Sequence, residues 1–238
     1  MTTALVSNSK PIHERMLSSR KQLSDLIPVG LDVDRFLQIA WGVVRRNPAL
    51  LDCTPDSILS AVAQGAQLGL SFDRVLGQAF IVPYKKTAEF QIGYRGLIQL
   101  AYRSGRIVKI YALVVHKDDE FDVADGTDQK IFHKRNLSVD RSQEEEWKGA
   151  YAVAVTKEGV TFSTFLTASQ VLKRKARSKA KDSEYSPWNT DPEEMWKKSA
   201  IRDLSKVLPV SPETEQAIQA AIADEYRDAG VETPEVTD

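Results

Sequence analysis

The sequence predicts an α+β protein, in which a small antiparallel β-sheet with a β-hairpin is flanked by several α-helices. Three observations predict this class. Marked helix starts occur early in the chain, short β-type runs gather in its middle, and helical patterns return from residue 168 onward. Strands joined by short polar turns pair antiparallel, and helices grouped before and after them are typical of α+β proteins.

The N-terminal third is predicted to be helical. Apolar residues recur at helical spacing over residues 11–27 and 32–46. The clearest helix spans 54–69, where Thr54 provides an N-cap hydroxyl, Pro55 occupies the first helical position and Gly69 marks the end.

The middle of the chain is predicted to form strands. Residues 77–84 and 88–94 are β-type runs around the polar turn Lys85-Lys86-Thr87, which predicts a hairpin. A short helix over 95–105 and a β-branched strand over 106–116 follow. Residues 148–166 then read as two strands that turn at Glu158-Gly159.

Three further helices are predicted near the C-terminus. The first begins at Ala168, and the second begins at Asp191-Pro192 with a capping-box carboxylate. A third begins at Ser211-Pro212 and ends near Gly230. The chain has no internal repeat and no low-complexity linker, so we expect one core over residues 1–209 with a helical lead-in over 10–46. Residues 210–238 form a separate helix and acidic tail, either mobile or partner-binding.

The composition describes a soluble globular protein, with 42% hydrophobic and 27% charged residues. Its single cysteine, Cys53, excludes an internal disulfide and a cysteine-rich zinc site. The sequence has neither a signal peptide nor an apolar span long enough for a membrane. We therefore expect a cytoplasmic protein that does not associate with membranes.

The charge is distributed unevenly along the chain. The whole protein has a net charge of −1, but residues 207–238 hold eight acidic residues against one basic residue, a balance of −7. The first 206 residues therefore carry +6, as suits a protein that binds a polyanion. A solvated acidic helix end explains the tail alone equally well.

Basic residues gather in two predicted helices. In the range 171–188, Leu172 and Ala176 share one helical face, and cations spread around the rest at Lys173, Arg174, Lys175 and Arg177. In the range 195–208 an apolar stripe accompanies a row formed by Lys198, Arg202 and Lys206. Tyr185 and Trp188 lie between these rows, and cationic grooves with aromatic rings commonly hold single-stranded nucleic acid. A solvated surface is the alternative explanation for either row.

Catalytic motifs are absent from the sequence. It contains no phosphate-binding G-x-x-x-x-G-K-[ST] motif and no G-x-S-x-G motif. Three histidines lack metal-ligand spacing. One acidic cluster, formed by Asp118, Asp119, Glu120 and Asp122, has the residue types of a Mg²⁺ or Mn²⁺ site in a nuclease, but a polar turn is the favoured interpretation.

The order of motifs resembles the RecT family of phage-type recombinases. The resemblance spans about residues 47–211 and rests on "NPALLDCTPDSILSAVAQGAQLGL", "LGQAFIVPY", "FQIGYRGLIQLAYRSG", "KGAYAVAV", "SPW" and "MWKKSAIRDLSKVLPVS". It implies ATP-independent single-stranded DNA binding, annealing of complementary strands, and assembly into rings or filaments. It also implies a phage exonuclease and a host single-strand-binding protein as candidate partners, in a bacterial cytoplasm. No cofactor is expected, with Mg²⁺ as the one candidate.

The resemblance also implies a set of DNA-binding residues. Arg95 stands where lysine is commoner in the family, and Ser199 where threonine is commoner. For Trp188 we favour core packing over base stacking. Together with the basic residues above, the predicted set is Lys85, Lys86, Gln91, Tyr94, Arg95, Arg103, Lys173, Arg174, Lys175, Arg177, Trp188, Lys197, Lys198 and Arg202.

Two other functions remain open at this point. A metal-dependent nuclease would use Asp118, Asp119 and Glu120. A DNA- or RNA-binding scaffold without annealing activity would explain the basic rows equally well.

Overall fold

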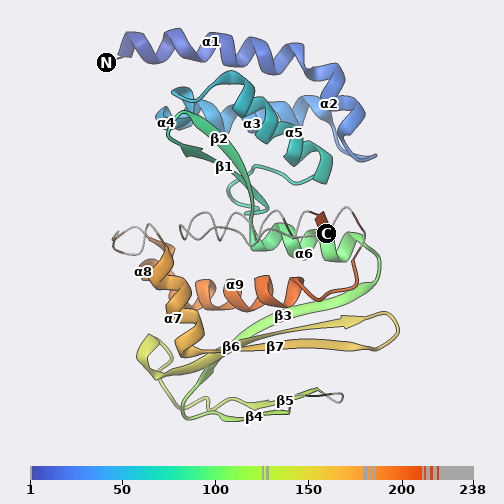
Figure 1. Ribbon diagram of the computed structural model, residues 1–238. Helices are drawn as coiled ribbons and strands as arrows, with labels where there is room; N and C mark the ends of the chain where they lie inside the picture. The colour runs from blue at the N-terminus through green and yellow to red at the C-terminus, as the bar shows by residue number, and fades with distance from the viewer. Residues whose placement is uncertain are drawn as a thin grey trace, which may run out of the picture. The chain divides into compact units, whose positions relative to one another are not determined.

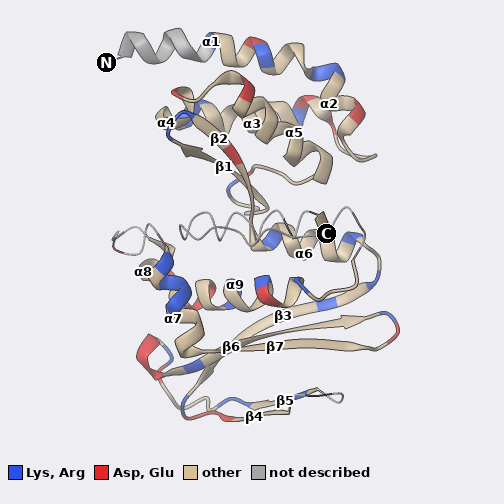
Figure 2. Cartoon of the chain, viewed as in Figure 1, with Lys and Arg blue, Asp and Glu red and all other residues tan. Residues whose placement is uncertain are grey.

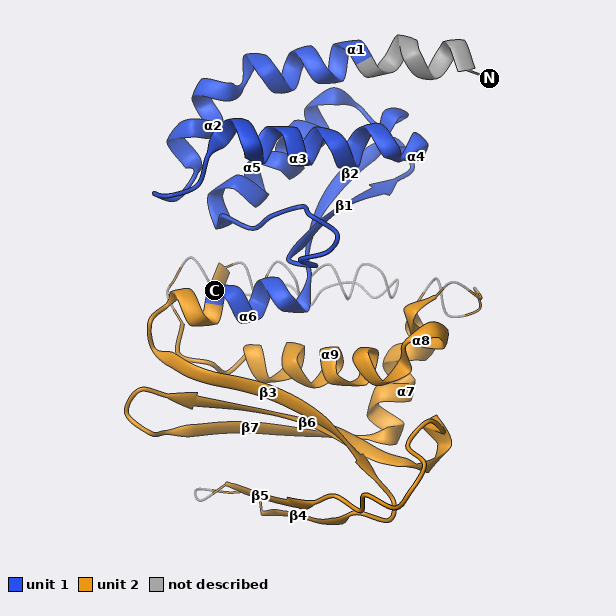
Figure 3. Ribbon diagram, turned by 180° about the vertical axis from the view of Figure 1, so that it is seen from behind, with its two compact units in different colours: residues 1–100 blue, residues 101–238 orange. Residues whose placement is uncertain are grey.

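The computed structural model describes residues 2–124, 126, 129–178, 182, 184, 186–210, 212, 215–216 and 219, with only the backbone described for residues 2–9. The chain divides into two compact units, residues 1–100 and 101–238 (Figure 3). The single core over residues 1–209 stays a prediction. Most of the helix and tail predicted after Ser211 lie outside the described residues.

The first unit combines helices with a hairpin (Figure 1). Its strands β1 (Ala79–Tyr84) and β2 (Thr87–Ile92) pair antiparallel, with Ala79 opposite Ile92. The helices are α1 (Thr2–Ser18), α2 (Arg20–Leu26), α3 (Val33–Arg46), α4 (Pro48–Leu51), α5 (Pro55–Leu68) and α6 (Tyr94–Arg103). The last three residues of α6 belong to the second unit.

Local signals account for α5. The Thr54 hydroxyl accepts a hydrogen bond from the Ser57 amide, and Gly69 ends the helix in the left-handed region at φ +57°. Both ends therefore match the prediction. The predicted helix over 11–27, by contrast, is two helices. The hydroxyls of Ser18 and Ser19 donate to the Arg15 carbonyl, so local side-chain bonds accompany the break between α1 and α2.

The second unit is built on a three-stranded antiparallel sheet. Its order is β3 (Ile107–His116), β6 (Trp147–Thr156) and β7 (Thr161–Thr167). A separate hairpin of β4 (Glu120–Ala124) and β5 (Lys130–Lys134) was not predicted. The remaining elements are the 3₁₀ helix η1 (Glu144–Glu146) and the helices α7 (Ala168–Arg177), α8 (Pro187–Thr190) and α9 (Pro192–Ser205).

The two faces of this sheet are covered differently. Ala150, Ala152 and Ala154 of β6 are fully buried, and these small side chains allow α9 to pack closely on one face. On the other face Tyr151 and Val153 pack with Phe121 and Ile131 of the β4–β5 hairpin. Figure 1 shows α9 and the hairpin on opposite sides of the strands. The prediction of an α+β protein with small antiparallel sheets is confirmed.

Two details of the C-terminal prediction change. Helix α9 begins after Asp191 as predicted, but the Asp191 side chain makes no capping bond. Its carboxylate accepts a hydrogen bond from the Thr190 hydroxyl at 3.0 Å instead, so the predicted capping box is wrong. Among the residues that the structure describes, no helix has the length and apolar character needed to cross a bilayer.

Candidate nucleic-acid interface

Two glycines bring a loop close to the start of α6. A Cβ atom on Gly93 would lie 2.2 Å from the Gly77 carbonyl oxygen, and one on Gly96 would lie 2.2 Å from the Gln78 carbonyl oxygen. The Gly93 amide donates to the Gln78 carbonyl at 2.9 Å. Only glycine permits this approach, which explains the spacing in "QIGYRGL" without a phosphate-binding role.

This packing positions Tyr94 and Arg95, which we predicted as DNA-binding residues. Arg95 is exposed; its Nη1 donates to the Val75 carbonyl at 3.3 Å and its Nε to the Tyr94 hydroxyl at 3.3 Å. The guanidinium carbon lies 5.9 Å from the centre of the Tyr94 ring. A cation held beside an aromatic ring offers both a phosphate contact and a surface for a base.

Gln91 lies just before this pair, at the end of β2. Its side-chain amide donates to the Tyr84 hydroxyl at 2.8 Å across the hairpin. Sequence reasoning missed Tyr84 and Val75 because one acts through a neighbouring strand and the other through a backbone carbonyl. Neither leaves a pattern in the sequence.

Lys85 and Lys86 are exposed at the tip of the β1–β2 hairpin. Lys85 has φ +56°, a conformation that costs a residue with a Cβ atom about 1–2 kcal/mol. The Lys86 carbonyl accepts a hydrogen bond from the Thr54 amide at 2.9 Å, which ties the tip to the start of α5. No ion pair or hydrogen bond of either ammonium group is recorded within the described parts of the chain.

Helix α7 presents only part of its basic set to solvent. Lys173 and Arg177 are exposed, whereas Arg174 donates to the Ser199 carbonyl and to Asp203, both at 2.9 Å. Lys175 pairs with Glu144 at 2.7 Å. The predicted apolar face is wrong, because Leu172 and Ala176 are exposed and Val171 is buried. Figure 2 shows the concentration of basic residues on this helix.

Helix α9 carries the other predicted basic residues. Lys197 pairs with Glu193 at 2.7 Å and Glu194 at 3.1 Å. Burial opposes the charge of Lys197, but its two carboxylate partners outweigh that effect and raise its pKa. Lys198 and Arg202 are half-buried on the same helix. Helices α7 and α9 are in contact, and Arg174 of α7 joins them through the Ser199 carbonyl and Asp203 of α9.

The remaining predicted residues differ in exposure. Trp188 is buried within α8, where its amide donates to the Ser186 hydroxyl, in keeping with the packing role that we favoured. Tyr185 lies outside the described residues. Arg103, the last residue of α6, is exposed, and desolvation by its neighbours lowers its guanidinium pKa. The group stays protonated at neutral pH because an arginine pKa begins so high.

The acidic cluster is part of a buried polar network. The Asp119 carboxylate is fully buried and accepts hydrogen bonds from Arg141, from His133 Nε2 at 2.9 Å and from the amides of Asn136 and His116. Burial would raise the pKa of Asp119, but these donors hold it well below its ordinary value. Asp119 therefore organises the β4–β5 hairpin. The described residues contain no group of three or more side chains placed to hold a metal ion.

Exposed cations, with one arginine held beside an aromatic ring, are typical of the class of proteins that bind nucleic acid. Comparison with known proteins gives the family. The RecT family model matches residues 34–237. Protein RecT of Escherichia coli (strain K12) is 38% identical over 209 residues, which cover 84% of this chain and 76% of that protein.

A second relative is the uncharacterized protein YqaK of Bacillus subtilis (strain 168). It is 30% identical over 165 residues, which cover 69% of this chain and 55% of YqaK. The chain belongs to the RecT family. It is accordingly a DNA-binding, single-strand annealing protein associated with recombination.

Proposed function

We propose that the protein anneals complementary DNA strands without a nucleotide cofactor, as an oligomer that holds one strand by its phosphates and leaves the base edges open. Exposed cations support this proposal most directly. Lys173 and Arg177 on α7, Lys85 and Lys86 on the hairpin, and Arg95 on α6 all face solvent. Base pairing supplies about 1.4 kcal/mol per stacked step, so no hydrolysis is needed to drive the reaction.

The residues fall into two groups in this proposal. Lys85, Lys86, Arg95, Lys173 and Arg177 contact phosphates, and the Tyr94 ring lies against a base. Arg174, Lys175 and Lys197 act indirectly, because each already pairs with a carboxylate or a carbonyl that positions α7 or α9. Mg²⁺ would act here as a screening counter-ion. A phage exonuclease and a host single-strand-binding protein remain candidate partners in a bacterial cytoplasm.

Annealing of two dye-labelled complementary oligonucleotides without ATP tests this function. Fluorescence transfer reports the rate, and a salt series reports the phosphate contacts. We expect acceleration that declines steeply with salt, because each neutralised phosphate contributes about −0.7 to the slope of log affinity against log salt for single strands. Tight binding of single strands without acceleration would favour a binding scaffold, and cleavage of labelled DNA with Mg²⁺ would favour a nuclease.

A pair of variants locates the phosphate contacts. Lys173→Glu with Arg177→Glu should lower affinity for single-stranded DNA by about tenfold or more and reduce the salt slope. Lys10→Glu with Lys148→Glu changes the charge by the same amount at two exposed positions outside the predicted set. Equal losses in the two double variants would show that only net charge matters and would contradict the assignment.

A further inference from the structure

An exposed apolar turn joins α2 to α3 in the first unit. Val29 is fully exposed, and Leu26 and Leu31 are 37% and 46% exposed. The Leu31 amide donates to the Pro28 carbonyl at 3.3 Å, and Gly30 has φ +96°, as the third position of a type II turn requires. Residues 28–31 therefore form a defined type II turn that presents Val29 at its apex. Figure 3 shows it projecting from the end of the unit.

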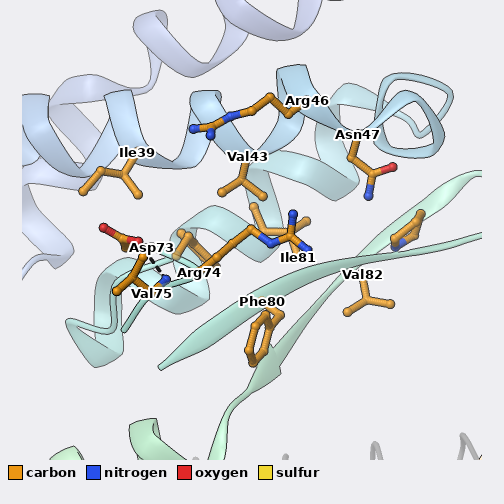
Figure 4. A pocket seen from close by; sticks show the side chains of 12 residues that line it. Ile39, Val43, Arg46, Asn47, Asp73, Arg74, Val75, Phe80, Ile81 and Val82 are labelled. Atoms are coloured by element: carbon orange, nitrogen blue, oxygen red, sulfur yellow. Dashed lines mark hydrogen bonds between the residues drawn. The ribbon is translucent and has the colours of Figure 1, made fainter. Parts of the chain in front are cut away.

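The same unit contains an open apolar pocket of about 670 Å³. It is lined by Ile39 and Val43 of α3, by Val75 of the loop between α5 and β1, and by Phe80 and Val82 of β1 (Figure 4). Val75 is 81% exposed and Phe80 is 39% exposed, so apolar surface extends from the pocket onto its rim. Exposed apolar surface around a hollow is typical of a protein-binding site.

Two arginines line this pocket. Arg46 folds back along α3 and donates from Nε to the Gly42 carbonyl at 2.8 Å. A Cβ atom at position 42 would lie 3.1 Å from Arg46 Nη2, so glycine there leaves room for this arrangement. Arg74 extends between α3 and β1 (Figure 4). Its side chain is exposed and has no recorded hydrogen bond or ion pair within the described residues.

The turn and the pocket are complementary in charge as well as in polarity. Asp25, Asp32 and Asp34 flank the apolar turn. Asp34 is paired with Arg20 at 2.6 Å and Asp32 caps α3, which leaves the exposed Asp25 without a recorded partner in the described part of the chain. The pocket lining holds Arg46 and Arg74 against one carboxylate, Asp73, which accepts a hydrogen bond from the Val75 amide at 2.9 Å. The lining therefore carries a net positive charge. An apolar segment with an acidic flank fits such a site.

The turn cannot fill the pocket of its own chain in this fold. It precedes the first residue of α3, whereas the pocket is lined by the later turns of that helix, and α3 spans about 20 Å at 1.5 Å per residue. The full exposure of Val29 shows that the turn is not seated there. The pocket can therefore receive this turn only from another copy.

We propose that the 28–31 turn of one copy inserts into the pocket of Ile39, Val43, Val75, Phe80 and Val82 of the next copy. Such a contact joins two different surfaces, so it repeats head to tail and produces rings or helical filaments. Asp25 of one copy then approaches Arg74 of its neighbour. This inference rests on the oligomer of the proposed function and assigns the surfaces that build it.

Two variants test the contact, because each removes one half of it. Val29→Lys places a positive charge in the turn, opposite Arg46 and Arg74, and Val75→Asp places a negative charge at the pocket, opposite the acidic flank of the turn. Both positions are exposed, so both variants should fold. Sedimentation velocity, with and without a short single-stranded oligonucleotide, reports assembly. Each variant alone should need about tenfold or more protein to assemble, since each brings like charges together across the contact. Val160→Asp, at an exposed valine of the second unit, is the matched control and should assemble normally.

Mixing the two variants identifies a head-to-tail contact. Each retains one intact half, so an equimolar mixture should form a complex that neither variant forms alone at the same concentration. The charge swap Asp25→Arg with Arg74→Asp in one chain should assemble better than either single change. Normal assembly of Val29→Lys would overturn the proposal, as would a wild-type chain that stays a single copy under both conditions.

The outcome separates this proposal from the proposed function. A Val29→Lys chain that loses assembly but still binds single-stranded DNA in a gel shift supports the contact. A wild-type chain that assembles through this contact yet does not accelerate annealing would contradict only the function. A Val75→Asp chain that assembles normally but binds DNA weakly would make the pocket part of the DNA site and overturn the contact.

Discussion

Asp119 shows how one carboxylate can determine the stability of a hairpin. Its side chain is fully buried and accepts hydrogen bonds from Arg141, His133 and two backbone amides. These donors stabilise its negative charge. A buried charge of this kind destabilises a protein mainly when one partner is removed, because the other partners are then left without a bond. Asp119, which was considered as a metal ligand only as the less favoured alternative, thus has a structural role.

Asp119→Asn should lower the free energy of unfolding by about 2–4 kcal/mol at pH 7. Because the folded pKa of Asp119 is lowered, its charge stabilises the fold fully above the unfolded aspartate pKa of about 4 and progressively less as pH falls below it. The difference between wild type and variant should therefore shrink in acid. Urea unfolding at pH 7 and pH 3.5 measures it. Asp122→Asn, at an exposed position of β4 three residues later, should change little at either pH.

Lys85 indicates a compromise between stability and charge. It occupies φ +56° at the tip of the β1–β2 hairpin, where glycine would be unstrained. Lysine at such a position is consistent with a binding role that outweighs the strain.

Lys85→Gly should raise the free energy of unfolding by about 0.5–1 kcal/mol, because relief of strain exceeds the added entropy of the unfolded chain. It should at the same time weaken binding of single-stranded DNA. Lys86→Gly removes the same charge next to it but relieves no strain, since Lys86 has no positive φ. Thermal unfolding and a gel shift compare the two. Equal stability changes would contradict the explanation from strain.

At the level of elements, the sequence predicted those helix ends that depend only on neighbouring residues. The Thr54 cap and the Gly69 end fixed α5 because both act within four residues of the helix. The exposed side of α7 could not be predicted, since the partners of Arg174 lie 25 and 29 residues away. The β4–β5 hairpin was missed because the acidic residues in and just before β4 were interpreted as a polar turn. The apolar Phe121 and Ile131, which alternate with charged residues in β4 and β5, pack inward.

Helix α7 should consequently have two separable sides. Arg174→Ala removes hydrogen bonds to the Ser199 carbonyl and to the Asp203 carboxylate. Burial alone would raise the pKa of Asp203, but hydrogen bonds from Arg174 and Lys206 lower it. We expect a loss of about 1–3 kcal/mol in the free energy of unfolding. Lys173→Ala, one residue earlier and exposed, should leave that free energy unchanged within about 0.5 kcal/mol and should weaken DNA binding. Chemical unfolding of both variants checks the distinction.

At the scale of the whole molecule, the sequence predicted the class of fold and the family better than the site. Several motifs that match a family in the same order identify that family, although any one of them alone would be weak evidence. Contacts such as the hydrogen bond from Arg95 to the Val75 carbonyl depend instead on the conformation of the 71–78 loop. Gly93 and Gly96 allow that loop to approach closely, but their presence in the sequence does not predict its conformation. The division at residue 100 likewise has no linker composition to mark it.

The uneven charge of the chain leads to a last prediction. Residues 207–238 carry −7 and the first 206 carry +6, so the acidic end should repel phosphates or compete with them for the exposed cations. Neutralising Asp224, Glu225, Asp228, Glu232 and Glu235 to the corresponding amides should raise affinity for single-stranded DNA about tenfold at low salt. The gain should fade at high salt, where both effects are screened. Fluorescence anisotropy over a salt series measures it, and an affinity that does not change at any salt would mean that the tail charges act elsewhere.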